Sequence, residues 1–152
     1  MKHRDWMRLA LQEAEKAYSL DEIPVGAVVV RHGQVLALAH NEKEKAQDPT
    51  AHAEILAIRR AAEVSGSWRL TDAVLYVTLE PCPMCAGAIV QSRIKQLVYG
   101  VSDPKGGAVE SVMKMLNPEL WNHKVEVIAG VREEECLALL KKYFQGKRHA
   151  EM

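Results

Sequence analysis

The strongest constraint on the fold of this chain is the alternation of two apolar patterns along its 152 residues. Short runs rich in Val, Leu, Ile and Tyr are typical of buried strands, and the stretches between them carry apolar residues at helical spacing. The predicted strands cover 27–30, 35–39, 73–78, 96–100 and 125–128. A chain that interleaves strands with helices in this way folds as helices layered on a sheet.

The predicted helices give the order α-β-β-α-β-α-β-α-β-α. We expect Thr50 to cap the second helix and His32-Gly33 to form the turn of a hairpin between the first two strands. A hairpin followed by helical crossovers predicts a mixed sheet, in one domain spanning residues 1–152. The predicted helices cover 4–20, 51–65, 81–92, 109–116 and 132–146.

Composition excludes few functions. Apolar residues make up 48% of the chain and charged residues 26%, but no apolar run approaches the roughly 18 residues of a membrane span. The first eleven residues lack the apolar centre of a signal peptide, so we expect a cytoplasmic protein that does not enter a membrane. Because the net charge is zero, binding to nucleic acid would depend on a local basic patch. The C-terminal residues Lys141, Lys142, Lys147 and Arg148 are the candidate, and a solvated helix face is the alternative.

Metal-binding chemistry is concentrated in two short segments, His52-Ala53-Glu54 and Pro81-Cys82-Pro83-Met84-Cys85. Cys82 and Cys85 stand three apart at a predicted helix start, where both sulfurs face the same side and the helix dipole favours thiolates. His52 begins another predicted helix. These three ligands would leave a fourth position on Zn²⁺ for water, as in catalytic zinc sites.

Glu54 lies in the same predicted helical turn as His52 and is not needed as a ligand. If it faces the metal, its carboxylate can take a proton from a water molecule whose pKa the ion has lowered, and zinc-held hydroxide can then attack a carbon bearing an amino group. A structural zinc site and a redox dithiol remain alternatives from the residues alone. A structural zinc site normally has four protein ligands, and the chain has no second CxxC to complete one. A redox dithiol would leave His-Ala-Glu without a role. The third cysteine, Cys136, has the setting of a core residue, and an odd number argues against a disulfide scaffold.

The spacing H-x-E…P-C-x-x-C is the signature of zinc-dependent base deaminases. Beyond it, the chain resembles the bacterial-type tRNA-specific adenosine deaminases over nearly its whole length. The matching stretches are 23–27, 51–54, 75–93 (LYVTLEPCPMCAGAIVQSR), 103–107, 122–123 and the helix containing Tyr143 and Phe144.

This resemblance implies a cytidine-deaminase-like α/β/α sandwich of three layers with a five-stranded mixed sheet. It implies a homodimer with one Zn²⁺ per subunit, held by His52, Cys82 and Cys85, with Glu54 as proton shuttle. The implied reaction is hydrolytic deamination of adenosine to inosine at the wobble position, the first of the anticodon. The expected partner is the anticodon stem-loop of a tRNA, with an arginine tRNA as the leading candidate.

The resemblance also implies substrate contacts. Asn41 would hydrogen-bond the flipped base, and Val28 and Ala53 would form pocket walls. The positions that resemble RNA contacts are Asp103, Lys105, His123, Phe144 and Arg148. From the residues alone, Asp103 before Pro104 is a turn former, Phe144 a core residue and Asn41 a loop cap.

Two features lie outside this assignment. Glu80 precedes the segment that contains Cys82 and Cys85. It is either a carboxylate at the end of a strand, a residue that supports the site or a residue of a dimer contact, and we leave it outside the predicted site. Val109-Glu110-Ser111 departs from the small residues of many relatives and puts an acid beside the expected RNA rim. A deaminase of free guanine, cytosine or nucleosides would share the zinc residues, and an RNA-binding subunit with structural zinc is a non-enzymatic alternative.

Overall fold

In the computed structural model, five strands form one sheet in the order β2-β1-β3-β4-β5. The model describes the backbone of residues 1–151 and the side chains of residues 1–147. β1 runs antiparallel to both β2 and β3, whereas β3, β4 and β5 are parallel. The strands are β1 (Gly26–Arg31), β2 (Gln34–His40), β3 (Ala73–Leu79), β4 (Gln96–Val101) and β5 (Glu126–Ile128). The predicted mixed sheet is confirmed.

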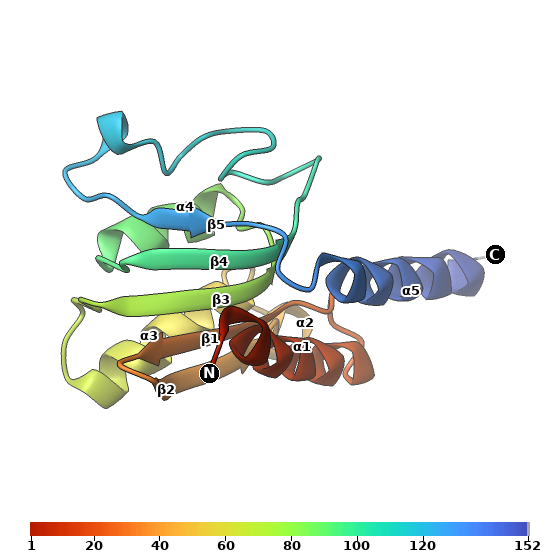
Figure 1. Cartoon of the computed structure of the whole chain (residues 1–152). Helices are drawn as coiled ribbons and strands as arrows, with labels where there is room; N and C mark the ends of the chain where they lie inside the picture. The colour runs from red at the N-terminus through yellow and green to blue at the C-terminus, as the bar shows by residue number, and fades with distance from the viewer. Residues whose placement is uncertain (152) are drawn as a thin grey trace.

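Helices cover both faces of this sheet, as Figure 1 shows. One face packs on α3 and α4, with Ala57 and Ile89 in its core. The other face packs on α1 and α5, with Met7 and Leu140 in its core. The helices are α1 (His3–Ser19), α2 (Lys43–Ala46), α3 (Ala53–Ser65), α4 (Pro83–Gln91) and α5 (Glu133–Glu151), with a 3-10 turn η1 (Pro118–Leu120) before β5. The predicted three-layer α/β/α sandwich is therefore confirmed.

Strand directions bring four chain segments to one edge of the sheet. Gly26, which opens β1, pairs with His40 at the end of β2, and Ala27 pairs with Val77 near the end of β3. Since β3 and β4 are parallel, the carboxyl end of β4 lies at the same edge. Crevices at the carboxyl ends of parallel strands are where open α/β sheets bind ligands.

Two local predictions are wrong, and both for reasons of hydrogen bonding. The predicted helix at 109–116 is a series of turns, because the N–H groups of Val109, Glu110 and Ser111 donate to the carboxylate of Glu80. Thr50 does not cap α3: its hydroxyl donates to Asp48 (2.7 Å), and His52 occupies the N-cap position. In the described part of the chain, no helix combines the length and apolar character required to cross a bilayer.

Gly26 allows α1 to pack closely on β1. A Cβ at this position would collide with the carbonyl oxygen of Ala10 and lie 2.5 Å from the nitrogen of Ala14. Both are backbone atoms that move only with the helix. We therefore expect Gly26→Ala to lower the free energy of unfolding by about 3 kcal/mol, at the upper end for overpacked cores.

Urea unfolding measures this loss of stability. Gly146→Ala is the matched control, because Gly146 lies within α5 and a Cβ there meets nothing within 4 Å. That variant should gain about 0.5–1 kcal/mol, as alanine favours a helix interior over glycine. Equal stabilities for the two variants would show that the contact between α1 and β1 is not as tight as the structure has it.

Candidate metal centre and substrate cavity

Three metal-binding side chains converge at this edge of the sheet. The ligand atoms of His52, Cys82 and Cys85 all lie within 4.8 Å of one another, and no other group of three or more metal-binding side chains occurs in the described part of the chain. His52 is the N-cap of α3, Cys82 is the N-cap of α4, and Cys85 lies in the first turn of α4. The N-termini of α3 and α4 therefore meet at these three side chains.

The local sequence explains why these side chains point together. His52 and Cys82 both have extended backbone angles, so their side chains leave the chain before the helices begin. Pro83 at the first position of α4 favours a helix start there and lacks the N–H that would otherwise need a partner. Cys85, three residues after Cys82, returns to the same side after most of one helical turn.

The spacing of these atoms fits a tetrahedral metal ion. The Nδ1 of His52 lies 3.6 Å from the sulfur of Cys82 and 3.6 Å from that of Cys85. Tetrahedral zinc with Zn–S bonds of about 2.3 Å and Zn–N bonds of about 2.0–2.1 Å requires a sulfur–nitrogen separation of about 3.6 Å. One imidazole and two thiolates are also ligand types that zinc prefers, so the residues present fit the ion that the sequence implied.

The pKa values of the three candidate ligands indicate the charge of the site. Hydrogen bonds from Cys85 and His52 outweigh the effect of burial and lower the pKa of Cys82 to about 4. The pKa of Cys85 is raised, because its thiol is engaged with Cys82 and is buried. The hydrogen bond to Cys82 also raises the pKa of His52. A thiolate is therefore favoured before any metal is bound, which provides negative charge for a cation.

Glu54 lies in the first turn of α3, next to the three ligands. Its side chain is buried, with the residue 4% exposed, and no ion pair to it occurs among the described residues. Burial raises the pKa of Glu54 to about 7. A divalent cation at the three ligands would lower this pKa, since a nearby positive charge favours the carboxylate.

His52, Cys82 and Glu54 border a cavity of about 490 Å³, within the range of small-ligand pockets, and Cys85 lies buried behind them. A second cavity of about 860 Å³ adjoins it and shares five lining residues with it. The shared residues are Ile23, Leu79, Asp103, Phe144 and Lys147. The site is therefore a small chamber that opens into a wider groove.

Asn41 lines the chamber and joins two of its walls. Its Oδ1 accepts the N–H of Ala53 (2.8 Å), and its Nδ2 donates to the carbonyl of Ile23 (3.1 Å). A side-chain amide has two N–H donors and two acceptor lone pairs, so one donor and one acceptor of Asn41 remain for a ligand. Asn41 is thus both the loop cap that its residue type suggested and a polar group within reach of the chamber.

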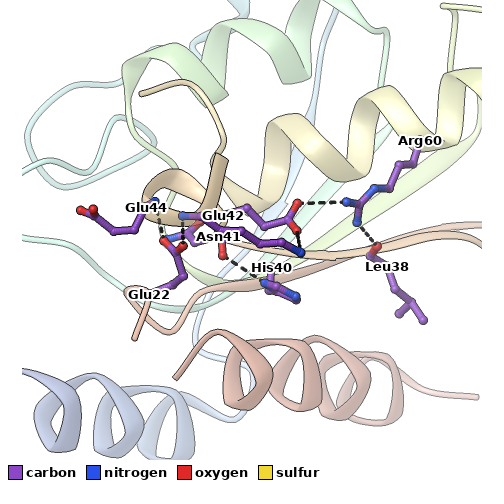
Figure 2. Close-up of polar contacts among 8 residues, drawn as sticks. Glu22, Leu38, His40, Asn41, Glu42, Glu44 and Arg60 are labelled. Atoms are coloured by element: carbon purple, nitrogen blue, oxygen red, sulfur yellow. Dashed lines mark hydrogen bonds and ion pairs between the residues drawn. The ribbon is translucent and has the colours of Figure 1, made fainter. Parts of the chain in front are cut away.

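One rim of the chamber is the segment 42–46, shown in Figure 2. The buried carboxylate of Glu22 accepts the N–H groups of Glu44 (3.0 Å) and Lys45 (2.8 Å). On the far side of the segment, Arg60 donates to Glu42 (3.1 Å) and to the carbonyl of Leu38 (2.9 Å). These contacts fix the short helix α2 beside the chamber.

The opposite rim is the loop 103–111, and the carboxylate of Glu80 holds it from below. Burial raises the pKa of this carboxyl group, but hydrogen bonds from Glu110, Ser111 and Asp103 together lower it. The side chain of Glu110 accepts the hydroxyl of Tyr99 (2.7 Å). The acid that sequence analysis placed beside an RNA rim is therefore engaged with the tyrosine beneath the loop.

Two predicted pocket walls are not where we expected them. Val28 is fully buried in the core cluster that faces α1 and α5, and it does not line the chamber. Side chains alternate along a strand, so Val28 and Val29 face opposite sides of the sheet. Ala53 is also fully buried and reaches Asn41 only through its backbone N–H. Val25, three residues before Val28, lines the chamber instead.

His123 does not lie at the chamber. Its Nε2 donates to the carbonyl of Ile94 (2.7 Å), just before the start of β4. Asp103 follows the other end of this six-residue strand, which spans about 20 Å. Within one chain, the parallel direction of β4 and β5 therefore separates His123 from the three candidate metal ligands, and its contact with RNA stays a prediction.

The remaining predicted contacts lie along the chamber and groove. Asp103 and Phe144 line both cavities, and Lys105 lines the groove. The Oδ1 of Asp103 accepts the N–H groups of Lys105 (3.0 Å) and Gly106 (3.2 Å), so Asp103 is also the turn former that its sequence suggested. The side chain of Arg148 lies outside the described part of the chain.

Several residues of the site are not among those predicted from the sequence. Val25 lies within a stretch that we had matched to relatives, so the alternation of the following strand could have selected it over Val28. Glu22 gave no signal, because an isolated acid before Pro24 reads as a solvent-exposed loop residue. The other missed lining residues include Ile23, Lys43, Leu79, Tyr143 and Lys147.

Comparisons with known proteins agree with this geometry. The family model of the MafB19-like deaminases matches residues 1–148. The tRNA-specific adenosine deaminase of Bacillus subtilis is 50% identical over 94% of this chain and 89% of its own length. The protein of that description from Agrobacterium fabrum is 48% identical over 94% of both chains.

Solved structures of two deaminases are also similar to this chain. A structure from work on A-to-I editing by tRNA:A34 deaminases at the wobble position has a TM-score of 0.86 and 49% identity, covering 90% of this chain and 99% of its own. A guanine deaminase from Bacillus subtilis has a TM-score of 0.64 and 40% identity, covering 67% and 66%. The chain with this cluster of a histidine, two cysteines and a buried glutamate therefore belongs to the deaminase family, and it falls within the group of tRNA-specific adenosine deaminases.

Proposed function

We propose that this protein is a zinc-dependent enzyme that hydrolytically deaminates adenosine to inosine at the wobble position of a tRNA. The observation that carries the proposal is the convergence of His52, Cys82 and Cys85 at a small chamber that His52, Cys82 and buried Glu54 line. The proposed substrate is taken from the close relatives, which are tRNA-specific adenosine deaminases at about 50% sequence identity over most of the chain.

His52, Cys82 and Cys85 would hold one zinc ion per chain. The bound ion would supply a water molecule of lowered pKa for attack on the carbon that bears the amino group. Because only three protein ligands converge among the described residues, the set matches catalytic sites, whereas structural zinc takes four.

Glu54 is the group that moves protons. Hydrolysis forms a carbon–oxygen bond from water and breaks the bond to the amino group, which leaves as ammonia. Two protons from water must reach the ring nitrogen and the departing amine. The Glu54 carboxylate lies beside the ligands, is buried from bulk water and is not a ligand itself, so it can accept a proton at one oxygen and return it.

The groove beside the chamber supports an RNA substrate over a free base. A purine alone needs only the chamber, whereas the larger groove has exposed Lys105 and Lys141 at its edge, neither in an ion pair with a described residue. Phe144 is 43% exposed between the two cavities, as expected for a ring on which a base stacks. RNA enzymes of this class flip the target base out of its stack and into the chamber.

A direct test is incubation of the zinc-loaded protein with an arginine tRNA that has adenosine at the wobble position. We expect mass spectrometry of the digested tRNA to show inosine at that position and at no other. The control tRNA carries guanosine there. Absence of inosine from a protein with full zinc content would contradict the proposed substrate.

Deamination of a free base is the second candidate, and the similarity to a guanine deaminase structure is the observation that favours it. That similarity covers two thirds of the chain, and the chemistry needs only the chamber. A spectrophotometric screen of guanine, cytosine, adenine and their nucleosides distinguishes the two. Turnover of a free base without turnover of tRNA would favour this second function.

Asn41 offers a specific prediction about the substrate. In Asn41→Asp, one carboxylate oxygen still accepts the N–H of Ala53, but both amide N–H donors are lost, the one bound to the carbonyl of Ile23 and the one that remains for a ligand. A lost hydrogen bond to a buried ligand group is worth about 1–3 kcal/mol, so we expect kcat/KM for tRNA to fall roughly tenfold to a hundredfold. Steady-state kinetics measure the change, and a melting curve checks the fold. Unchanged kinetics would remove Asn41 from base recognition.

We further propose that the chain forms one domain and acts in the cytoplasm as a homodimer. Met84, Val112 and Met113 are large apolar side chains at least 37% exposed, and surfaces of this kind favour association. Light scattering after gel filtration should give twice the mass of 17.0 kDa. A mass of one chain at micromolar concentration would exclude a stable homodimer.

A further inference from the structure

Glu80 is a buried carboxylate that the chemistry of the site does not use. It follows β3 directly and is only 2% exposed. Its Oε2 accepts the backbone N–H groups of Val109 (3.1 Å), Glu110 (2.8 Å) and Ser111 (3.0 Å). Its Oε1 accepts the N–H of Asp103 (3.0 Å) and the hydroxyl of Ser111.

Five hydrogen bonds occupy both oxygens of this carboxylate. An ionised carboxylate has about four lone-pair positions, so Glu80 has none left for a substrate or a water molecule. It therefore cannot exchange protons with the reacting base, as Glu54 can. Its partners all belong to one segment, the loop 103–111, so its contacts define the path of that loop.

Gly107 shows how closely the loop fits around the carboxylate. A Cβ at Gly107 would overlap the Cδ and both oxygens of Glu80. A Cβ at neighbouring Gly106 would meet only the Oδ2 of Asp103, at the ordinary distance of 3.4 Å. Of the two neighbouring glycines, only Gly107 lies so close to Glu80 that a side chain cannot be accommodated.

The loop carries residues of the proposed RNA contact. Asp103 lines both cavities and Lys105 lines the groove, on the rim opposite Glu22 and the segment 42–46. Without the carboxylate of Glu80, the backbone N–H groups of the loop would hydrogen-bond to water. The side chains of Asp103 and Lys105 would then no longer be held in fixed positions.

We propose that Glu80 is a positioning residue that holds the loop 103–111 against the chamber and thereby sets the affinity for the RNA around the target base. This inference rests on the proposed function. A residue acting in this way should change KM for the polynucleotide, while the chemical step at Glu54 continues once the RNA is bound.

The test is Glu80→Gln in the full-length, zinc-loaded protein. In either orientation of the glutamine amide, its NH₂ group replaces one of the two carboxylate oxygens. The backbone N–H groups that donated to that oxygen then lose their acceptor. Because the Ser111 hydroxyl can rotate and accept, the favoured orientation leaves the N–H of Asp103 without a partner. We expect amide hydrogen exchange to become about tenfold faster in 103–111 and to stay unchanged in α3 and α4.

In the same variant we expect KM for an anticodon stem-loop to rise about tenfold, with kcat within about twofold of the parent protein. Gly107→Ala should reproduce both effects by displacing the carboxylate, whereas Gly106→Ala should keep the loop protected from exchange. Glu22→Gln should speed exchange at Glu44 and Lys45 and leave 103–111 protected. Glu13→Gln controls for loss of a buried carboxylate, since Glu13 pairs with Lys16 on α1 and lines neither cavity.

Two results would overturn the proposal. One is unchanged exchange in 103–111 of Glu80→Gln. The other is a fall in kcat with KM unchanged, which would make Glu80 part of the chemistry or of the metal centre; zinc content separates these. If the parent protein makes no inosine, the proposed function fails, but the exchange measurements still decide whether Glu80 holds the loop.

Discussion

Glu54→Gln should lower the rate of deamination by about 10²–10⁴-fold, the usual contribution of a positioned acid–base group. Glutamine has nearly the same shape as glutamate but cannot accept and return a proton. Because Glu54 is not one of the three converging ligands, we expect zinc content to stay the same. The fold should also survive, since replacing a buried carboxyl group by a neutral amide removes the cost of burying charge.

Inosine formed per chain in a single turnover, together with metal content, measures this effect. Glu63→Gln is the matched control, because Glu63 lies on α3 with its side chain exposed. A Glu54→Gln variant that keeps most of its turnover would end the assignment of Glu54 as the proton shuttle. A variant that binds tRNA normally and makes no inosine would also exclude the non-enzymatic alternative for the parent protein.

Cys85→Ser should abolish activity by removing zinc. The Cys85 side chain is fully buried against His52 and Cys82, so no other donor can take its place without moving α4. A serine hydroxyl is a poor substitute for a thiolate, which zinc favours strongly. We expect metal content to fall from about one ion per chain to near zero, and inosine formation to fall below detection.

Cys136→Ser separates loss of the ligand from loss of a buried thiol. Cys136 is buried in the core that faces α1 and α5, away from the metal residues. This control should lose some stability but keep zinc and turnover. Removing zinc from the parent protein with a chelator should stop the reaction, and adding zinc back should restore it. Full activity of Cys85→Ser, or of the chelated protein, would contradict a catalytic role for zinc.

The strands and most helices could be predicted because periodicity is a local property. The runs 73–77 and 97–99 are apolar throughout, as a strand buried on both faces requires. The segment 109–116 failed for the opposite reason. Its apolar residues have helical spacing, but its N–H groups donate to Glu80, which lies 29 residues before Val109. Nothing in the local sequence indicates this distant acceptor.

The metal residues and Glu54 could be identified from sequence because each pair is only two or three residues apart at a helix start. Spacing along one helical turn fixes which side chains face together. The substrate contacts had no such constraint. Choosing Val25 over Val28 depends on the face of β1, and excluding His123 from the chamber depends on the direction of β4.

By itself, then, the sequence determined the layered α/β architecture, and it singled out the three candidate metal ligands and the glutamate beside them, since all of these follow from short-range spacing. Only the tertiary structure decided how the chamber is walled. It brought Glu22 and Glu80 under opposite rims and placed Asn41 between two segments distant along the chain. Contacts of this kind depend on which ends of which strands meet, and that is settled when the sheet assembles.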